Sequence, residues 1–209
     1  MTNPKLYSSE ELDTCVGFNV INLGTFEQQF FSASTLFTVL SQNDMNWSDD
    51  YTIRMQITDW RLVAARDAAL SIYHFGKALH AIRSFAGASK QYGGKLNAVE
   101  LKKVKILFDQ NFPDITSMRH AISHAGELAE NPRVYAEHVL KENAQGDGFF
   151  IAAGASQGLA LNGVNLSIPW RGKMITVGIG QDTADTLALV RQGVSDALSG
   201  KFTGSNMNR

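Results

Sequence analysis

Apolar side chains recur every three or four residues through most of the first 143 positions, and this spacing predicts amphipathic helices. A capping-box pattern at Thr25–Gln28 predicts the start of the first helix. Asn97, with Glu100 three residues later, predicts the start of another helix, and Asn131 followed by Pro132 predicts a further one. The predicted helices cover residues 25–40, 51–88, 97–112, 114–131 and 132–143, with a break near residue 59 left open.

The pattern changes near Asn143, after which short apolar or alternating segments predict strands. These strands cover residues 149–153, 164–168 and 173–179, with a turn at Arg171-Gly172, and a final helix follows over residues 183–198. The predicted fold is mainly α, an up-and-down helical bundle of about five helices with a small C-terminal antiparallel β-strand unit and a final helix. We expect residues 1–145 to form the bundle. Residues 146–209 would form an appendage packed on the bundle or on a partner chain, because so few strands bury little surface alone.

Composition places the chain among compact proteins with a real core. Of its 209 residues, 44% are hydrophobic and 19% are charged, which suits one domain with an appended subdomain. A single cysteine, Cys15, excludes an internal disulfide framework and a cysteine-rich zinc module. The start of the chain lacks the pattern of a secretory leader, and no apolar run approaches the length of a membrane span. We therefore expect a soluble, cytoplasmic protein without a membrane partner.

Charge is unevenly distributed although the net charge is only -1. Residues 1–50 contain one lysine and seven acidic residues, whereas residues 77–119 contain eight lysines and arginines and three acidic residues. Lys102, Lys103 and Lys105 in the basic segment are candidates for holding a phosphodiester backbone electrostatically. An ordinary solvated helix face carrying surface lysines explains the same charge count.

One helix face carries the main candidate site. Placed at 100° per residue, His120, His124 and Glu127 cluster on the side opposite the apolar stripe of the fourth predicted helix, with Arg119 nearby. Arg119 and His124 leave a straight helix about 140° and about 7.5 Å apart, so one helix converges them poorly. A second copy of the helix alongside would complete a shared groove, which predicts a homodimer. The alternative is a solvated polar face.

The string Arg119-His-Ala-Ile-Ser-His124 resembles the arginine, four residues, histidine motif of the HEPN superfamily, and residues 20–143 resemble its helical bundle. The resemblance implies a helical bundle, dimerisation through the motif helices and, in many members, metal-independent endoribonuclease activity. On that hypothesis His124 accepts the proton of a ribose 2′-hydroxyl and Arg119 stabilises charge on the phosphoryl oxygens. His120 serves as the complementary acid or positions phosphate, and Glu127 lines the binding groove.

Other residues support weaker hypotheses. His120 and His124 four residues apart could share a metal, but too few ligands accompany them, so we predict neither a metal nor another cofactor. Asp67 and His74 share a face of the second helix, which favours a buried Asp–His or Arg66–Asp67 pair. A supporting contact from Asp67 and His74 to the motif histidines is the functional alternative. Aromatic residues Trp60, Phe75 and Phe85 are interpreted as core.

Three functional classes remain open at this stage. The first is an RNA-cleaving homodimer, with RNA as substrate and a protein partner such as an antitoxin. The second is a non-catalytic HEPN-like module that binds a protein or senses a ligand, because a fold does not establish an active site. The third is a small-molecule metalloenzyme, which would require bound metal.

Overall fold

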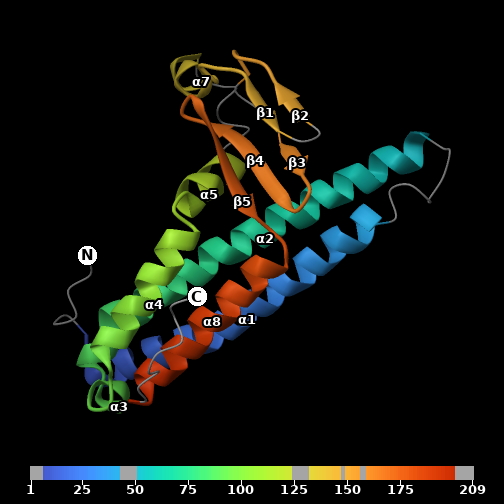
Figure 1. The fold of residues 1–209 in the computed structure, drawn as a ribbon. Helices are drawn as coiled ribbons and strands as arrows, with labels where there is room; N and C mark the ends of the chain where they lie inside the picture. Colours follow the sequence, from blue (N-terminus) through green and yellow to red (C-terminus); the bar gives the residue numbers. More distant parts are fainter. Residues whose placement is uncertain (1–6, 43–50, 124–131, 147–148, 156–158, 201–209) are drawn as a thin grey trace. The chain divides into compact units, whose positions relative to one another are not determined.

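The computed structural model describes residues 7–42, 51–123, 132–146, 149–155 and 159–200 (Figure 1). Helices dominate, and a small antiparallel sheet and a final helix follow them, which confirms the predicted fold class. The described helices are α1 (Ser9–Gln42), α2 (Tyr51–Phe85), α3 (Lys90–Gly93), α4 (Ala98–Asn111), α5 (Ile115–Ser123), α7 (Pro132–His138) and α8 (Gln181–Leu198). The strands are β1 (Ala144–Gly146), β2 (Phe149–Ile151), β3 (Ala160–Asn162), β4 (Asn165–Trp170) and β5 (Lys173–Gly178).

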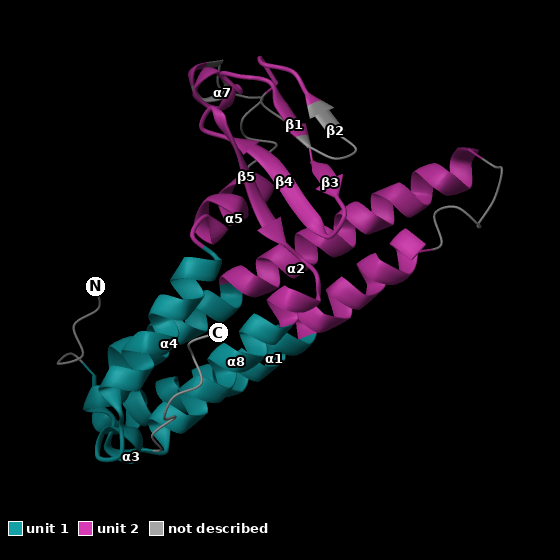
Figure 2. Cartoon of the chain, viewed as in Figure 1, with its two compact units in different colours: residues 1–28, 74–112, 185–209 teal, residues 29–73, 113–184 magenta. Residues whose placement is uncertain are grey.

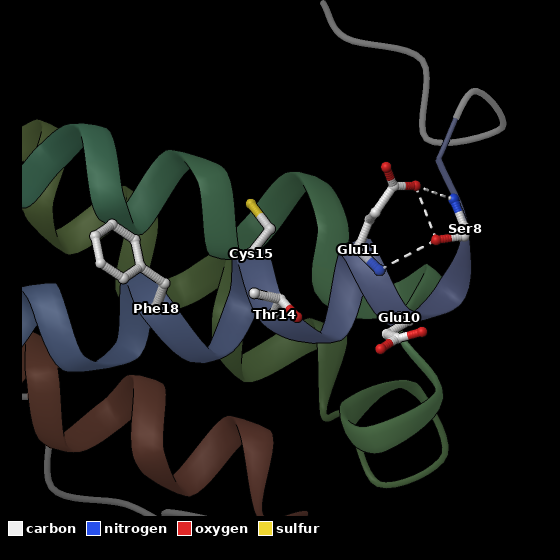
Figure 3. A pocket seen from close by; sticks show the side chains of 6 residues that line it. All are labelled: Ser8, Glu10, Glu11, Thr14, Cys15 and Phe18. Carbon is white, nitrogen blue, oxygen red and sulfur yellow. Dashed lines mark hydrogen bonds between the residues drawn. The ribbon is translucent and has the colours of Figure 1, made fainter.

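Helix α1 begins sixteen residues before its predicted start, and a different capping box explains why. The Glu11 carboxylate accepts hydrogen bonds from the Ser8 backbone N–H (2.7 Å) and hydroxyl (2.8 Å), while the Ser8 hydroxyl accepts one from the Glu11 backbone N–H (Figure 3). These bonds satisfy donors at the helix start and lower the pKa of Glu11. The predicted cap at Thr25 is wrong: Thr25 lies inside α1, and its hydroxyl donates to the Ile21 carbonyl.

The other helix boundaries follow their local signals more closely. Helix α2 runs without a break past Asp59. The Asn97 side chain caps α4 by accepting a hydrogen bond from the Glu100 backbone N–H at 3.2 Å, as predicted. Helix α7 begins at Pro132, also as predicted, but ends at His138 rather than near residue 143. Strands β1 and β3 were not predicted from the sequence.

The chain divides into two compact units that interleave along the sequence (Figure 2). Unit 1 comprises residues 1–28, 74–112 and 185–209, and unit 2 comprises residues 29–73 and 113–184. Helices α1, α2 and α8 each contribute residues to both units. The boundary predicted at residues 145 and 146 falls inside β1, within unit 2.

Unit 1 is an all-helical core with close contacts between helices. Phe75 of α2 and Phe108 of α4 stack with ring centroids 5.9 Å apart, and Phe112 packs on Phe108 at 5.0 Å. Two glycines permit close approach: a methyl group on Gly76 would meet the Phe108 ring at 2.7 Å, and one on Gly193 would meet Val104 at 2.6 Å. The side chains of Phe75, Val104 and Phe108 are buried, which confirms Phe75 as core.

Among its described residues, unit 2 contains two antiparallel sheets, one of β1 and β2 and one with strand order β3-β4-β5. Arg171 and Gly172 join β4 to β5 with positive φ angles of 49° and 78°, as a tight two-residue hairpin turn requires. Every residue of β4 after Asn165 is buried, so the predicted alternation of buried and exposed positions is wrong for this central strand. The Ser167 and Thr176 hydroxyls hydrogen-bond across β4 and β5 at 2.8 Å, which satisfies these polar groups.

Within the described residues, no helix combines the length and apolar character needed to cross a membrane.

Candidate functional site

Helix α5 carries the described part of the candidate site. Its apolar stripe, Ile115, Met118, Ala121 and Ile122, is buried, and the helix contacts β4 and β5. The Asp114 carboxylate, just before the helix, lies 3.7 Å from the Lys173 ammonium at the start of β5. The sheet therefore covers one side of α5, within unit 2.

Arg119 and His120 lie side by side on α5, and both are half-buried. The Arg119 Nη1 atom is 3.4 Å from His120 Nδ1. The Arg119 guanidinium lies over the Tyr73 ring of α2, 5.7 Å from its centroid, which is within the range of a cation–π interaction. This contact holds the guanidinium near the aromatic ring and leaves it charged, since an arginine side chain does not lose its proton in proteins.

Two imidazoles flank the indole of Trp170, the last residue of β4. The His120 ring is nearly parallel to the indole, with centroids 6.3 Å apart and an interplanar angle of 13°. The His138 ring meets the indole edge-on at 4.2 Å. Trp170 and His138 are buried, so the indole fixes the position of both rings. We call His120, His138 and Trp170 the histidine–tryptophan cluster.

The packing of His120 corrects one prediction. The sequence placed His120 on a polar face pointing away from the core, but its ring is half-buried against Trp170. The physical reason is that β4 packs on α5 and supplies a large apolar surface there. His124 and Glu127, the other members of the predicted face, lie outside the described residues.

The three predicted lysines belong to α4, in unit 1, whereas Arg119 belongs to unit 2. Lys103 pairs with the buried Glu100 carboxylate at 2.7 Å, and Lys105 pairs with Asp109 at 2.5 Å. Lys102 is exposed. Two of the three ammonium groups are therefore paired along their own helix with acidic residues that the charge count of the segment already includes.

Three basic residues of the segment 77–119 lie near His80 of α2. Burial lowers the pKa of His80, and the neighbouring Lys105, Lys77 and Arg83 lower it further. Lys77, His80 and Arg83 are three residues apart, which places them on one side of α2. Three cations near one imidazole make this part of unit 1 locally positive.

Asp67 and His74 do not form the predicted buried pair. Both side chains are exposed, as is Arg66, so a buried Asp–His or Arg–Asp pair is wrong. The His74 ring instead stacks on Phe26 of α1, with centroids 5.4 Å apart, in unit 1. Asp67 and His74 are seven residues apart and so lie on one face of α2, but both are exposed on that face.

A shallow hollow of about 440 Å³ lies along the first turns of α1, lined by Ser8, Glu10, Glu11, Thr14, Cys15 and Phe18 (Figure 3). Cys15 is a free thiol. The Glu11 carboxylate in this hollow accepts the two hydrogen bonds from Ser8 that cap α1, so we assign it a role in helix stability.

Within the part of the chain that the structure describes, no three His, Cys, Asp or Glu side chains gather in a way that could hold a metal ion. No protein-family model, no curated protein and no solved structure matches this chain.

Proposed function

We propose that this chain is an HEPN-like RNA-binding protein that cleaves RNA without a metal ion, using Arg119 of α5 and His124 of the Arg119–His124 motif. The observation that supports the proposal is the pairing of Arg119 with His120 on α5. The Arg119 guanidinium contacts the Tyr73 ring, the His120 imidazole stacks on Trp170, and the two groups lie beside each other. Fixed cationic and imidazole groups are what phosphoryl transfer by positioning and electrostatics requires.

The proposed reaction is a transesterification within the RNA strand. His124 accepts the proton of a ribose 2′-hydroxyl, and the 2′-oxygen forms a bond to the adjacent phosphorus. The bond from phosphorus to the 5′-oxygen of the next nucleotide breaks, and that oxygen takes up a proton. The products carry a 2′,3′-cyclic phosphate and a 5′-hydroxyl. Arg119 stabilises the charge that develops on the phosphoryl oxygens, and His120 positions the phosphate or supplies the second proton.

Cleavage of a fluorescent RNA in the presence of a chelator tests this proposal. We expect Arg119→Ala and His124→Ala each to lower kcat/KM by at least about 100-fold, because an electrostatic donor and a general base each contribute on that scale. Arg54→Ala, which removes an exposed arginine of α2, serves as the matched control and should cleave as the wild type does. Equal activity of Arg119→Ala and wild type would rule the mechanism out.

The second candidate is a non-catalytic module that binds a ligand or a protein partner, such as an antitoxin. The packing of His120 against the buried Trp170 favours it, since an imidazole used in packing need not meet a substrate. The two candidates differ in salt dependence. An RNA-binding surface should lose affinity steeply between low and physiological salt, whereas a module that does not bind nucleic acid should show no measurable RNA affinity at either.

A further inference from the structure

The turn between β4 and β5, at the α7 end of the sheet, gathers three cationic side chains around one glycine (Figure 1). Arg171 and Lys173 are the sequence neighbours of Gly172, and the side chain of Lys141 packs on the open side of that glycine. A methyl group on Gly172 would meet the Lys141 methylenes at 3.2–3.4 Å. Lys141, Arg171 and Lys173 are exposed and belong to unit 2. We call these three residues the turn cations.

The backbone holds Lys141 in its position beside the turn. Its N–H donates to the Gly172 carbonyl at 3.3 Å. Leu140, one residue earlier, donates to the Ala155 carbonyl at 2.8 Å and accepts from the Gly154 N–H at 3.0 Å. A lysine whose backbone and stem are held in this way loses less conformational freedom when it binds an anion, and such ordering is one of the costs of binding.

Arg171 has a backbone conformation that an arginine does not favour. Its φ angle of 49° is the only positive φ among the described residues other than glycine. Together with the positive φ of Gly172 it gives a type I′ turn, whose first position favours Asn, Asp or Gly. A longer side chain is disfavoured in this left-handed region by contact with its own backbone. An arginine in this conformation at an exposed turn points to a role beyond folding.

The turn cations outnumber the acidic groups beside them. The Asp114 carboxylate lies 3.7 Å from the Lys173 ammonium, and both groups are exposed at the surface. Glu142, which follows Lys141 in the sequence, is exposed as well. Among the residues that the structure describes, no ion pair engages Arg171 or Lys141. The surface of the turn is therefore positive, and two of its cations can bind an anion without first leaving a carboxylate.

The turn continues directly from the indole on which His120 stacks. Trp170 precedes Arg171 and pairs across the hairpin with Lys173. The centroid of the His120 ring lies 6.3 Å from that of the indole, and Arg119 lies beside His120 on α5. Because phosphates repeat along an RNA strand, a strand held at Arg119 can bring a further phosphate to the turn.

We propose that Arg171 and Lys141, assisted by Lys173, bind the phosphodiester backbone of single-stranded RNA beside the Arg119 site. This role rests on the RNA binding proposed above and does not depend on cleavage. A guanidinium binds a phosphate through two parallel hydrogen bonds, and an ammonium adds a point charge. Contacts to the backbone position a strand without reading its bases, so the turn should raise affinity for any sequence. A strand also gains over a free phosphate ion, because it contacts Arg119 and the turn at once.

Fluorescence anisotropy of a labelled single-stranded RNA with 2′-O-methyl groups tests this role, since blocking the attacking hydroxyl allows binding to be measured without cleavage. We expect Lys141→Gln/Arg171→Gln to bind at least about fivefold more weakly than wild type at low salt, because two charge-assisted contacts are lost. The slope of log Kd against log salt should fall by about 1.4, since each contact to a single strand contributes about 0.7. Arg54→Gln/Lys95→Gln is the matched control: it removes the same charge from exposed sites elsewhere and should bind as the wild type does.

A second variant, Arg171→Asn, separates the function of the arginine from its cost to folding. Asparagine suits the first position of a type I′ turn, so this variant should have a higher urea midpoint than wild type and yet bind the RNA more weakly. Arg171→Lys keeps the charge and should bind more tightly than Arg171→Asn. An Arg171→Asn variant with wild-type affinity would overturn the proposed role.

The outcomes separate failure of this role from failure of the proposed function. If the wild type binds the RNA and Lys141→Gln/Arg171→Gln binds it equally well, the role of the turn is wrong while cleavage by Arg119 and His124 is unaffected. If the wild type has no RNA affinity at any salt concentration, both are wrong.

Two further measurements define what the turn binds. With cleavable RNA, Lys141→Gln/Arg171→Gln should raise KM and leave kcat unchanged, because contacts away from the reacting phosphate stabilise substrate and transition state equally. A loss confined to kcat would contradict this. Inorganic phosphate should displace the RNA only when its concentration far exceeds that of the RNA phosphates. Displacement at equal concentrations of phosphate groups would assign the turn to a free phosphate ion and overturn the proposal.

Discussion

The two compact units differ in the side chains that lie between their elements. Unit 1 brings its helices close together, with glycines at Gly76 and Gly193 that admit the side chains of Phe108 and Val104. Unit 2 packs the His120 ring of α5 and the His138 ring of α7 against Trp170 of β4. Both units leave large apolar side chains exposed, such as Ile21 in unit 1 and Trp60 in unit 2. The two units therefore differ in what fills their cores: helix against helix in unit 1, and imidazoles against an indole in unit 2.

In both units, burial decides what the loss of a side chain costs. A buried side chain in either unit should cost stability when truncated, while an exposed apolar one should cost little. Two tryptophans of unit 2 allow the distinction to be tested with one residue type. Trp170 is buried beneath two imidazoles, and Trp60 is exposed.

The largest expected effect on stability is that of Trp170→Ala. Removing a buried indole leaves a cavity and releases the His120 and His138 rings, so the free energy of unfolding should fall by about 3–5 kcal/mol. Trp60→Ala should change it by less than about 0.5 kcal/mol at concentrations where the chain is monomeric. Urea denaturation followed by circular dichroism measures both values. Similar losses in the two variants would contradict the contrast.

The close packing of unit 1 predicts opposite effects for two glycine-to-alanine substitutions. Gly76→Ala places a methyl group 2.7 Å from the buried Phe108 ring, and we expect the free energy of unfolding to fall by about 1–3 kcal/mol. Gly24→Ala, inside α1 where nothing lies within 4 Å, should raise it by about 0.5–1 kcal/mol through helix propensity. Thermal unfolding of both variants checks the signs, and a stabilising Gly76→Ala would show that the ring moves aside.

Local sequence signals predicted those elements whose start depends on a few neighbouring residues. Asn97 capped α4 and Pro132 began α7 because each acts on the next turn alone. The predicted start of α1 depends on the capping-box pattern at Thr25–Gln28, whereas the helix begins after a box of the same form at Ser8–Glu11. Buried Leu12 and Val16, four residues apart, were the available signal for the earlier start.

The candidate site was only partly predictable, because its neighbours come from distant parts of the chain. Helical spacing placed Arg119 and His120 on α5, but it could not indicate that Tyr73 and Trp170 would pack on them. Such contacts depend on how the sheet packs against α5, which no local pattern encodes. The exposure of Trp60 was missed for a related reason: an aromatic residue in a helical segment predicts a buried side chain, whereas Trp60 is 53% exposed.

Ser34→Ala tests how α1 is joined to the sheet inside unit 2. The buried Ser34 hydroxyl donates a hydrogen bond to the Ile179 carbonyl at 2.7 Å, just after β5. Removing the donor leaves a buried carbonyl without that bond, so the free energy of unfolding should fall by about 1 kcal/mol. Ser84→Ala, whose hydroxyl bonds to its own helix at an exposed site, is the control and should have a smaller effect. Chemical denaturation of both variants measures the difference.

The smallest expected effect concerns acid stability in unit 1. The Ser89 hydroxyl donates to the Asp13 carboxylate at 2.5 Å and the Gln91 backbone N–H donates at 3.1 Å, and these bonds lower the pKa of Asp13. A carboxylate whose pKa is lower in the folded state stabilises that state above its unfolded pKa, and this contribution is lost as pH falls through the folded value. Asp13→Asn should therefore be less stable than wild type at neutral pH, and the difference should shrink below about pH 4.

Ser89→Ala distinguishes the hydrogen bonds from the charge itself. This variant keeps the carboxylate but removes its strongest donor, so the pKa of Asp13 should rise toward its ordinary value. The stability difference between Ser89→Ala and wild type should likewise shrink in acid. Below the folded pKa of Asp13 the wild-type carboxyl group is protonated, so the Ser89 hydroxyl no longer donates to a charged oxygen. Urea midpoints measured between pH 7 and about pH 3 test both variants. Deficits that stay constant with pH would rule out the charge of Asp13 as their cause and would leave, for Ser89, the loss of its hydrogen bond from the Tyr92 backbone N–H at the start of α3.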